Sequence, residues 1–100
     1  MKIALMPNLT RKEALSVTQG ICKSLDNLGA GYCFLPEYKS DFESTEAAFL
    51  TEEEALGTCD AVIAVGGDGS IIHAAKTAAK YKKPILGVNA GRLAFMAGLE

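Results

Sequence analysis

The sequence predicts an α/β domain built on a doubly wound parallel sheet. Three observations support this fold class: short apolar runs recur along the chain, helical patterns separate them, and glycine or proline stands at most junctions. The apolar runs are continuous rather than alternating, which is typical of parallel strands covered on both faces. We expect about four strands with helices on both faces, and the strands are residues 2–7, 32–35, 61–65 and 84–88.

A helix is expected after the first strand, which ends at Pro7. Residues 10–13 read Thr-Arg-Lys-Glu, a capping-box pattern in which the threonine hydroxyl and the glutamate satisfy N–H groups at a helix start. Apolar and small side chains then recur at helical spacing, and Gly-Ala-Gly at 29–31 suits a left-handed C-terminal cap. The residues expected on the buried face are Leu15, Thr18, Ile21, Cys22, Leu25 and Leu28.

The middle of the chain is less regular. Residues 37–50 lose clear periodicity and gather charged and hydroxyl side chains, as a mobile surface connection does. A second capping box at 51–54 opens a short helix that Gly57 ends. Its three consecutive glutamates point in different directions around a helix, so we interpret them as solvated first-turn acids rather than a metal cluster. The last helix is expected at 70–81.

Length, composition and charge narrow the class of protein. At 100 residues the chain is one domain at most, and a hydrophobic content of 49% favours a folded core. The formal net charge of −2 argues against nucleic acid as a partner, because nucleic-acid modules usually carry a basic excess on one face. The first strand meets Pro7 before a long apolar stretch develops, so neither a signal peptide nor a membrane span is expected.

The cysteines favour a reducing compartment. Cys22, Cys33 and Cys59 are scattered, contain no C-x-x-C pair, and have His73 as the one imidazole available to them. Such a set indicates buried thiols rather than a metal or redox centre. We therefore expect a cytoplasmic protein.

The most distinctive segment is Gly-Gly-Asp-Gly-Ser at 66–70, between the third strand and the last helix. A purely structural interpretation is available, because glycines make tight strand-to-helix turns and Asp or Ser near a helix start is ordinarily a cap. However, three glycines around one carboxylate are more than a cap requires. The alanine-rich helix that follows can also lie close to the sheet and direct its N-terminus at a phosphate group.

The carboxylate separates this turn from the commoner phosphate loops. No Lys-Ser/Thr follows as in a Walker loop, and the G-x-G-x-x-G spacing is absent. Beside phosphate oxygens Asp68 would repel the ligand unless it bound Mg²⁺ or accepted a proton from an attacking hydroxyl. Both roles indicate phosphoryl transfer. In a doubly wound sheet this turn and residues 89–92 both follow strand ends, where ligands collect.

Two motifs resemble a known family. The residues at 66–70 resemble the GGDG signature shared by NAD kinases, diacylglycerol and sphingosine kinases and 6-phosphofructokinases. Residues 87–96, Gly-Val-Asn-Ala-Gly-Arg-Leu-Ala-Phe-Met, resemble the G-I-N-x-G-x-L-G-F-L element of NAD kinases, and residues 2–8 resemble their first strand. The departures are Ser70 where threonine is common, Ala94 in place of glycine and Met96 in place of leucine.

The resemblance implies a Rossmann-like amino-terminal nucleotide-binding domain, at residues 1–100, of an enzyme that phosphorylates the 2′-hydroxyl of the adenosine ribose of NAD. ATP or a related donor with Mg²⁺ would supply the phosphoryl group, and Asp68 would accept the hydroxyl proton. The family's Asn-Glu motif and β-rich carboxyl-terminal domain are absent from the 100 residues. The resemblance therefore implies that this chain alone is inactive and that the parent protein is a homo-oligomer. The implied nucleotide-binding residues are Gly66, Gly67, Asp68, Gly69, Ser70, His73 and Asn89.

Several polar residues keep two interpretations each. His73 either packs within its helix or contacts nucleotide, and Asn89 either adopts a left-handed turn or binds ligand. Arg92 either pairs with phosphate or is an exposed loop residue. Asn8 either touches nucleotide or serves helix entry. The apolar residues at 93, 95, 96 and 99 are expected to pack against a further domain or to promote self-association.

Other functions fit the sequence less well. A 6-phosphofructokinase expects a glycine-rich loop after the first strand, and residues 6–10 contain no glycine. A diacylglycerol-kinase-like enzyme shares the GGDG turn but leaves residues 87–96 without an explanation. A non-catalytic receiver-like module needs acidic residues at the end of the first strand, where this chain has Pro7 and Asn8.

Overall fold

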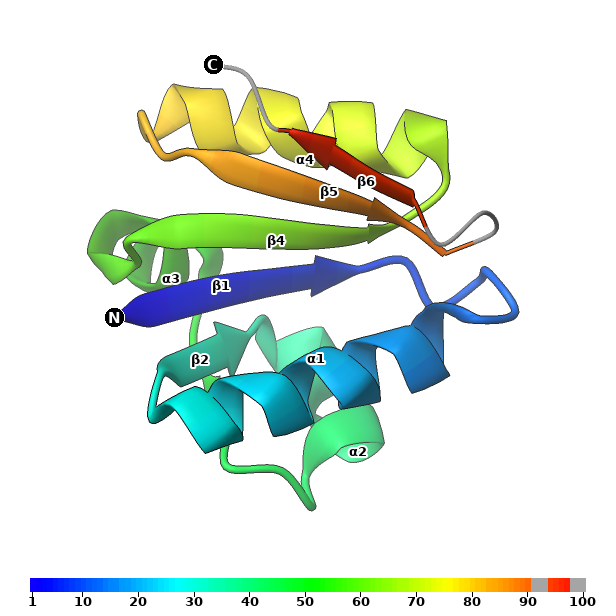
Figure 1. Cartoon of the computed structure of the whole chain (residues 1–100). Coiled ribbons are helices and arrows are strands. Elements are labelled where there is room, and N and C mark those ends of the chain that lie inside the picture. The colour runs from blue at the N-terminus through cyan, green and yellow to red at the C-terminus, as the bar shows by residue number, and fades with distance from the viewer. Residues whose placement is uncertain (91–93, 98–100) are drawn as a thin grey trace.

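The computed structural model describes residues 1–90 and 94–97, and side chains for residues 1–90. These residues form a six-stranded sheet in the order β3-β2-β1-β4-β5-β6 (Figure 1). The first five strands pair in parallel, and β6 pairs antiparallel with β5. The strands are β1 Lys2–Pro7, β2 Gly31–Phe34, β3 Ala48–Phe49, β4 Ala61–Gly66, β5 Ile85–Asn89 and β6 Ala94–Ala97.

The doubly wound α/β sheet predicted from the sequence is thus confirmed, together with all four expected strands. The two additional strands lie at the edges of the sheet. The pairing of β3 covers only two residues, a length too short to produce a hydrophobic pattern. Three of the four residues of β6, at 94–96, fall within the second motif, where no strand is expected from the sequence.

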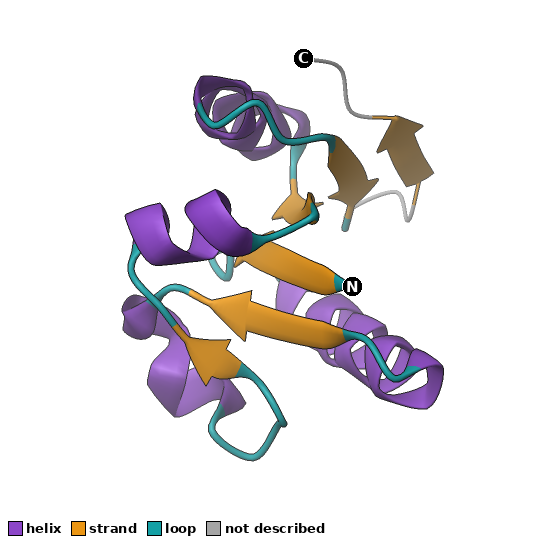
Figure 2. Ribbon diagram, turned by 90° about the vertical axis from the view of Figure 1, so that its left-hand side faces the viewer, coloured by secondary structure: helices purple, strands orange, loops and turns teal. Residues whose placement is uncertain are grey.

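Helices cover both faces of the sheet, as Figure 2 shows. Residues of α3 and α4 share one core cluster with Ala4, Val62 and Ala64, which point to one face of the central strands. Residues of α1 and α2 share a second cluster with Ile3 and Leu5, on the opposite face. The helical elements are α1 Ala14–Leu28, the 3₁₀ turn η1 Pro36–Tyr38, α2 Lys39–Phe42, α3 Glu52–Thr58 and α4 Asp68–Lys80.

The crossover connections that follow β1 and β4 run in opposite directions along the sheet. From β1 the chain passes through α1 to β2, whereas from β4 it passes through α4 to β5 on the other side. The loops that follow these two strands therefore meet at the switch point of the sheet, where doubly wound folds bind ligands. In Figure 1 the arrowheads of β1, β4 and β5 point to this edge.

The capping box expected at residues 10–13 is wrong. Helix α1 begins only at Ala14, and Glu13 at its N-cap makes no side-chain capping bond. Instead the Thr10 hydroxyl donates to Asn8 Oδ1 at 2.6 Å, and the Arg11 N–H donates to the Asn8 carbonyl at 3.2 Å. The local turn centred on Asn8 thus competes successfully with helix formation. The capping box between Thr51 and Glu54 is confirmed, with the Glu54 N–H donating to Thr51 Oγ1 at 3.3 Å.

The buried face of α1 also differs in part from the pattern expected from the sequence. Thr18, Cys22 and Leu25 are buried, but Leu15 and Leu28 are exposed, the latter at 79%. Leu28 is the last residue of the helix. The helix then ends as predicted, with Gly29 in the left-handed conformation at φ 71°.

Residues 37–50 are more structured than a surface connection. The segment contains part of η1, all of α2 and the edge strand β3. Phe42 is fully buried, and its ring stacks on that of Phe34 in β2 with centroids 4.0 Å apart and planes at 9°. A single aromatic residue therefore anchors a segment that looks polar in sequence.

All three cysteines are buried and free, as the sequence predicted. Burial raises the pKa of the Cys22 thiol to about 11, and it also raises the pKa values of Cys33 and Cys59. These thiols are therefore protonated at neutral pH and behave as small core side chains. Within residues 1–90 and 94–97, no helix has the length and apolar character needed to cross a membrane.

Candidate active site

The glycine-rich turn joins β4 directly to α4. Gly66 is the last residue of β4, Gly67 is the N-cap of α4, and Asp68 is already helical. Ser70 closes the turn, because its Oγ accepts from the Gly67 N–H and donates to the Gly67 carbonyl, both at 3.0 Å. The capping function that the structural interpretation gave to Asp or Ser therefore belongs to Ser70.

The glycines of the turn are explained by space rather than by backbone conformation. Gly67 has an ordinary φ of −94°, and Gly29 is the one glycine with positive φ among the described residues. A Cβ on Gly66 would lie 2.4 Å from Ser70 Oγ and 3.0 Å from Asn8 Cβ, so close packing excludes a side chain there. A Cβ on Gly69, by contrast, would meet no atom within 4 Å. The surface beside Gly69 is therefore open.

Asp68 and Asn89 lie together at the carboxyl ends of adjacent strands. The parallel register pairs Gly66 with Asn89. Asp68, two positions after Gly66, therefore lies within reach of the Asn89 side chain. The Asn89 amide Nδ2 donates to Asp68 Oδ1 at 2.5 Å. Asn89 is 4% exposed, whereas Asp68 is exposed. A buried amide thus holds an accessible carboxylate in one orientation.

This arrangement corrects one interpretation of Asn89. The left-handed turn considered for it is wrong, since Asn89 is the last residue of β5 and Lys82 is the one non-glycine residue with positive φ among those described. Arg92 lies outside the described residues, as do Leu93 and Leu99, and the side chains of Phe95 and Met96 are likewise not described. The expectations for these residues stay predictions.

A cavity of about 200 Å³ lies beside the turn. Its wall comes from the ends of β1 and β2 and from the first turns of α4, so it opens at the edge of the sheet where ligands are expected. His73 is exposed and lines this cavity, which does not fit the alternative that it packs among apolar neighbours. The lining residues are Met6, Pro7, Asn8, Leu35, Tyr38, Ser70, His73 and Ala74.

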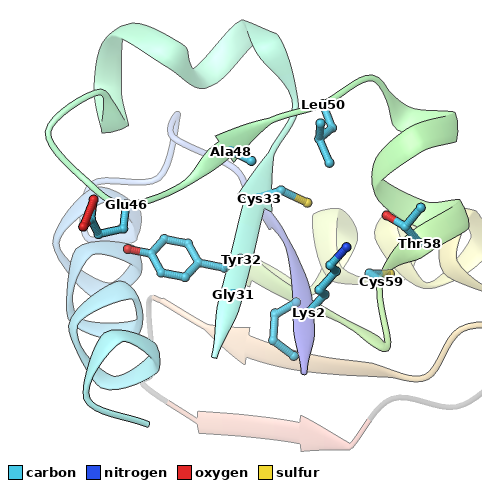
Figure 3. Close-up of a pocket in the computed structure, with 10 residues that line it drawn as sticks. Lys2, Gly31, Tyr32, Cys33, Glu46, Ala48, Leu50, Thr58 and Cys59 are labelled. Atoms are coloured by element: carbon cyan, nitrogen blue, oxygen red, sulfur yellow. The ribbon is translucent and has the colours of Figure 1, made fainter. Parts of the chain in front are cut away.

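A second cavity, of about 240 Å³, lies at the opposite ends of the strands (Figure 3). It is lined by Lys2, Gly31 and Tyr32 near the starts of β1 and β2, and by Cys33 and Cys59. Backbone turns at the amino ends of parallel strands rarely form the active site of a doubly wound sheet. We therefore place the candidate site at the glycine-rich turn.

Sequence reasoning missed one residue at the turn. Arg11 comes from the loop after β1, and its guanidinium covers Gly67: a Cβ on Gly67 would lie 3.1 Å from Arg11 Cζ and 3.2 Å from Nη1. The capping-box pattern at 10–13 predicts that Arg11 lies in the first turn of a helix, and the motif at 66–70 itself contains no basic residue. The signal that could have revealed Arg11 is the adjacency of β1 and β4 in this topology.

The residues around the turn can hold a metal only with help from a ligand. Among residues 1–90 and 94–97, no group of three or more His, Cys, Asp or Glu side chains could coordinate an ion. Mg²⁺ in phosphoryl-transfer sites is commonly held by one or two carboxylates together with substrate phosphates. Asp68 fits that partial contribution, whereas a dedicated protein cage for the metal is absent from this part of the chain.

The fold and the turn together define the class of doubly wound α/β domains with a glycine-rich turn at the sheet switch point. The particular family is the ATP-NAD kinase N-terminal domain, whose model matches residues 3–100. The chain belongs to this family.

Individual relatives agree with this assignment. The chain is 37% identical over 102 residues to the NAD kinase of Cellvibrio japonicus and 33% identical over 99 residues to that of Ruminiclostridium cellulolyticum, which covers 97% and 99% of this chain. It is also 62% identical over 42 residues to the NAD kinase of Psychrobacter arcticus, an alignment covering 42% of this chain and 13% of that protein. The chain spans about a third of the first two relatives, 34% of each.

Proposed function

We propose that this chain is the amino-terminal part of an enzyme that transfers a phosphoryl group from ATP or a related donor to the 2′-hydroxyl of the adenosine ribose of NAD, forming NADP. The observation that carries the proposal is the exposed Asp68 carboxylate, oriented by Asn89 at the switch point of the sheet. The names of the relatives support NAD as the acceptor.

In the proposed mechanism Asp68 accepts the proton of the attacking ribose hydroxyl. The hydrogen bond from Asn89 keeps the carboxylate from rotating away, so little reorganisation is needed when the acceptor binds. The first N–H groups of α4 have no carbonyl partner within the helix and face the same edge of the sheet. Together with the open surface at Gly69, they favour a phosphate group beside the carboxylate.

The cavity beside the turn supplies a second part of the proposed site. Asn8 and His73 offer polar groups to its interior, and Tyr38 offers an aromatic ring. This combination suits one part of a bound nucleotide, with Ser70 at the boundary between cavity and turn. We assign the nucleotide-binding role to Gly66, Gly67, Gly69, Ser70, His73 and Asn89 as part of the proposal.

Mg²⁺ would neutralise phosphate charge when it enters with the donor, held mainly by the donor phosphates. The remaining contacts to both substrates are proposed to come from the region of the relatives that this chain does not span. We further propose that the whole enzyme acts in the cytoplasm as a homo-oligomer. Alone, the 100 residues are expected to show little or no turnover.

The decisive variant is Asp68→Asn in the full-length protein that carries this chain. Because the amide cannot accept the hydroxyl proton, NADP formation should fall by about 10²-fold to 10⁴-fold. The measurement is the rate of NADP formation at saturating ATP and NAD. Thermal unfolding should change little, because Asp68 is exposed.

Asp41→Asn removes an exposed carboxylate in α2, away from the turn, and serves as the matched control. A folded Asp68→Asn variant with near-normal NADP formation would refute Asp68 as the base. Fructose 6-phosphate and diacylglycerol, offered as acceptors in the same assay, test the two alternative GGDG activities.

A further inference from the structure

Arg11 is an exposed basic residue that contacts the turn from a distant part of the sequence. Three guanidinium atoms lie close to the position that a Cβ atom would occupy at Gly67. A Cβ there would lie 3.1 Å from Cζ, 3.2 Å from Nη1 and 3.4 Å from Nε. Within the part of the chain that the structure describes, the guanidinium makes no hydrogen bond or ion pair. Its charge is therefore not neutralised by a neighbouring carboxylate.

The backbone explains why Arg11 reaches this position. The Asn8 N–H donates to the Val65 carbonyl at 2.7 Å, which extends the contact between β1 and β4 beyond the last residue of β1. The turn at Asn8 then directs residue 11 back across the switch point, and the Ala14 N–H donates to the Arg11 carbonyl at 3.1 Å as the chain approaches α1. The loop is thus held at three points by backbone hydrogen bonds.

The backbone conformation of Gly67 also bears on its contact with Arg11. Its φ and ψ of −94° and 175° are extended values that any residue adopts, so the conformation does not require glycine. A side chain at position 67 would instead crowd the guanidinium, which would have to move by a few tenths of an ångström. The contact therefore depends on two residues that no local pattern connects.

A positively charged side chain such as Arg11 would offset the negative charges of Asp68 and of a phosphate donor at the turn. An acceptor hydroxyl that approaches Asp68 must also meet a phosphate donor, and the carboxylate repels that donor. A planar guanidinium offers two parallel N–H donors to phosphate oxygens, which is the geometry of paired phosphate contacts. Arg11 lies over the residue directly before Asp68, on the side of the turn that faces β1.

We propose that Arg11 binds the phosphoryl donor and stabilises the transferred phosphoryl group. This proposal rests on the phosphotransferase function proposed above. In the step, the ribose oxygen forms a bond to the terminal phosphorus while the bond from that phosphorus to the bridging oxygen breaks. The bridging oxygen keeps the electron pair and leaves as part of the nucleoside diphosphate, and the hydroxyl proton passes to Asp68. Arg11 donates to the non-bridging oxygens throughout.

A binding experiment on the 100-residue chain tests the contact without turnover. Inorganic triphosphate is titrated into ¹⁵N-labelled protein, and the amide signals of Gly67 and Gly69 are followed by NMR. We expect saturable shifts that Arg11→Met abolishes or weakens at least tenfold, while Lys12→Met, which removes an equal charge from the next exposed residue, retains them. Equal binding by the Arg11 and Lys12 variants, or no saturable shift in the parent chain, would overturn the proposal.

Kinetics of the full-length protein test the role in transfer. Arg11→Ala should lower kcat/KM for the donor by roughly 10²-fold or more, with KM for NAD nearly unchanged. Arg11→Lys should recover only part of the loss, because an ammonium group cannot make the paired contact. An Arg11→Ala variant that loses affinity for NAD but not for the donor would contradict the assignment.

A double variant of Gly67 and Arg11 tests whether the two residues act through the same contact. Gly67→Ala should reduce donor kcat/KM by a larger factor when Arg11 is present than in the Arg11→Ala background. Additive losses would show that the two residues act independently.

The failure of either proposal can be recognised separately. If NAD is not the acceptor, Arg11-dependent triphosphate binding persists while NADP formation is absent from the parent protein. If only the Arg11 proposal fails, Asp68→Asn still abolishes NADP formation.

Discussion

At the scale of single residues, the glycines of the turn differ in what surrounds them. Gly66 is enclosed by Ser70 and Asn8, Gly67 lies beneath the Arg11 guanidinium, and Gly69 faces open space. The first is required for packing. The second makes room for a charged group, and the third leaves a surface that a ligand can approach. One motif therefore combines a structural constraint at Gly66 with two features that the proposed function uses.

These surroundings predict opposite effects of alanine at two positions. Gly66→Ala should lower the free energy of unfolding by about 1–3 kcal/mol, because the new Cβ overlaps Ser70 Oγ. Gly69→Ala should raise it by roughly 0.5–1 kcal/mol, since the residue is helical and unobstructed. Urea denaturation of the chain measures both.

Gly20→Ala in α1, also unobstructed, is the control for a gain of helix propensity that leaves the turn unchanged. Both Gly20→Ala and Gly69→Ala should stabilise the chain, but only Gly69→Ala should slow NADP formation in the full-length protein. A destabilising Gly69→Ala, or a neutral Gly66→Ala, would contradict these explanations.

At the scale of elements, the loop after β1 and the segment after β2 are positioned by single contacts. The Asn8 turn delays the start of α1 and brings Arg11 to the glycine-rich turn. Phe42 likewise attaches the short helix α2 to β2 through its stacked contact with Phe34. Since Tyr38 lies in the same segment and lines the cavity beside the turn, this attachment also shapes the proposed site.

Phe42→Ala should therefore destabilise the chain by about 3–5 kcal/mol, because it removes a fully buried ring. That loss is a large part of the total stability expected for a domain of this size. Chemical denaturation followed by circular dichroism provides the measurement. Leu28→Ala, at a site 79% exposed, is the matched truncation and should change stability by less than about 0.5 kcal/mol. A small effect of Phe42→Ala would mean that residues 37–50 are not anchored.

At the scale of the whole molecule, the core contains ionisable groups that the fold keeps neutral. Cys22 is 2% exposed and has a pKa raised to about 11, mainly by burial, while burial also raises the pKa of Tyr32 to about 12. Both groups lie in the cluster that joins α1 to the sheet. The stability of the whole domain is therefore linked to alkaline pH.

The direction of this effect follows from the proton balance. In the unfolded chain the Cys22 thiol ionises near pH 9, whereas in the folded chain it stays protonated until about pH 11. The unfolded state thus loses its proton first, and the free energy of unfolding should fall as pH rises from 9 to 11. Urea denaturation at several pH values measures the slope, and Cys22→Ala should make it shallower. An unchanged slope in that variant would contradict the burial of this thiol.

The sequence by itself determined the four longer strands, the three helices α1, α3 and α4, and the identity of the turn. Apolar runs, helical spacing and glycine placement are local properties, and they persist in the folded chain as β1, β2, β4 and β5 and as these three helices. The spacing of the GGDG turn and the residues at 87–96 also sufficed to recognise the family. Asp68 could be singled out for the same reason, because its place among glycines is readable without a structure.

Only the tertiary structure decided which side chains meet. Asn89 reaches Asp68 because the β4–β5 register pairs Asn89 with Gly66, and Arg11 reaches Gly67 because β1 lies beside β4. Phe42 is buried because its ring finds Phe34 in another element. Each contact joins segments far apart in the chain, and its energy depends on sheet register and packing rather than on local preference. The turn could therefore be predicted from the sequence, whereas the groups around the Asp68 carboxylate could be identified only in the folded molecule.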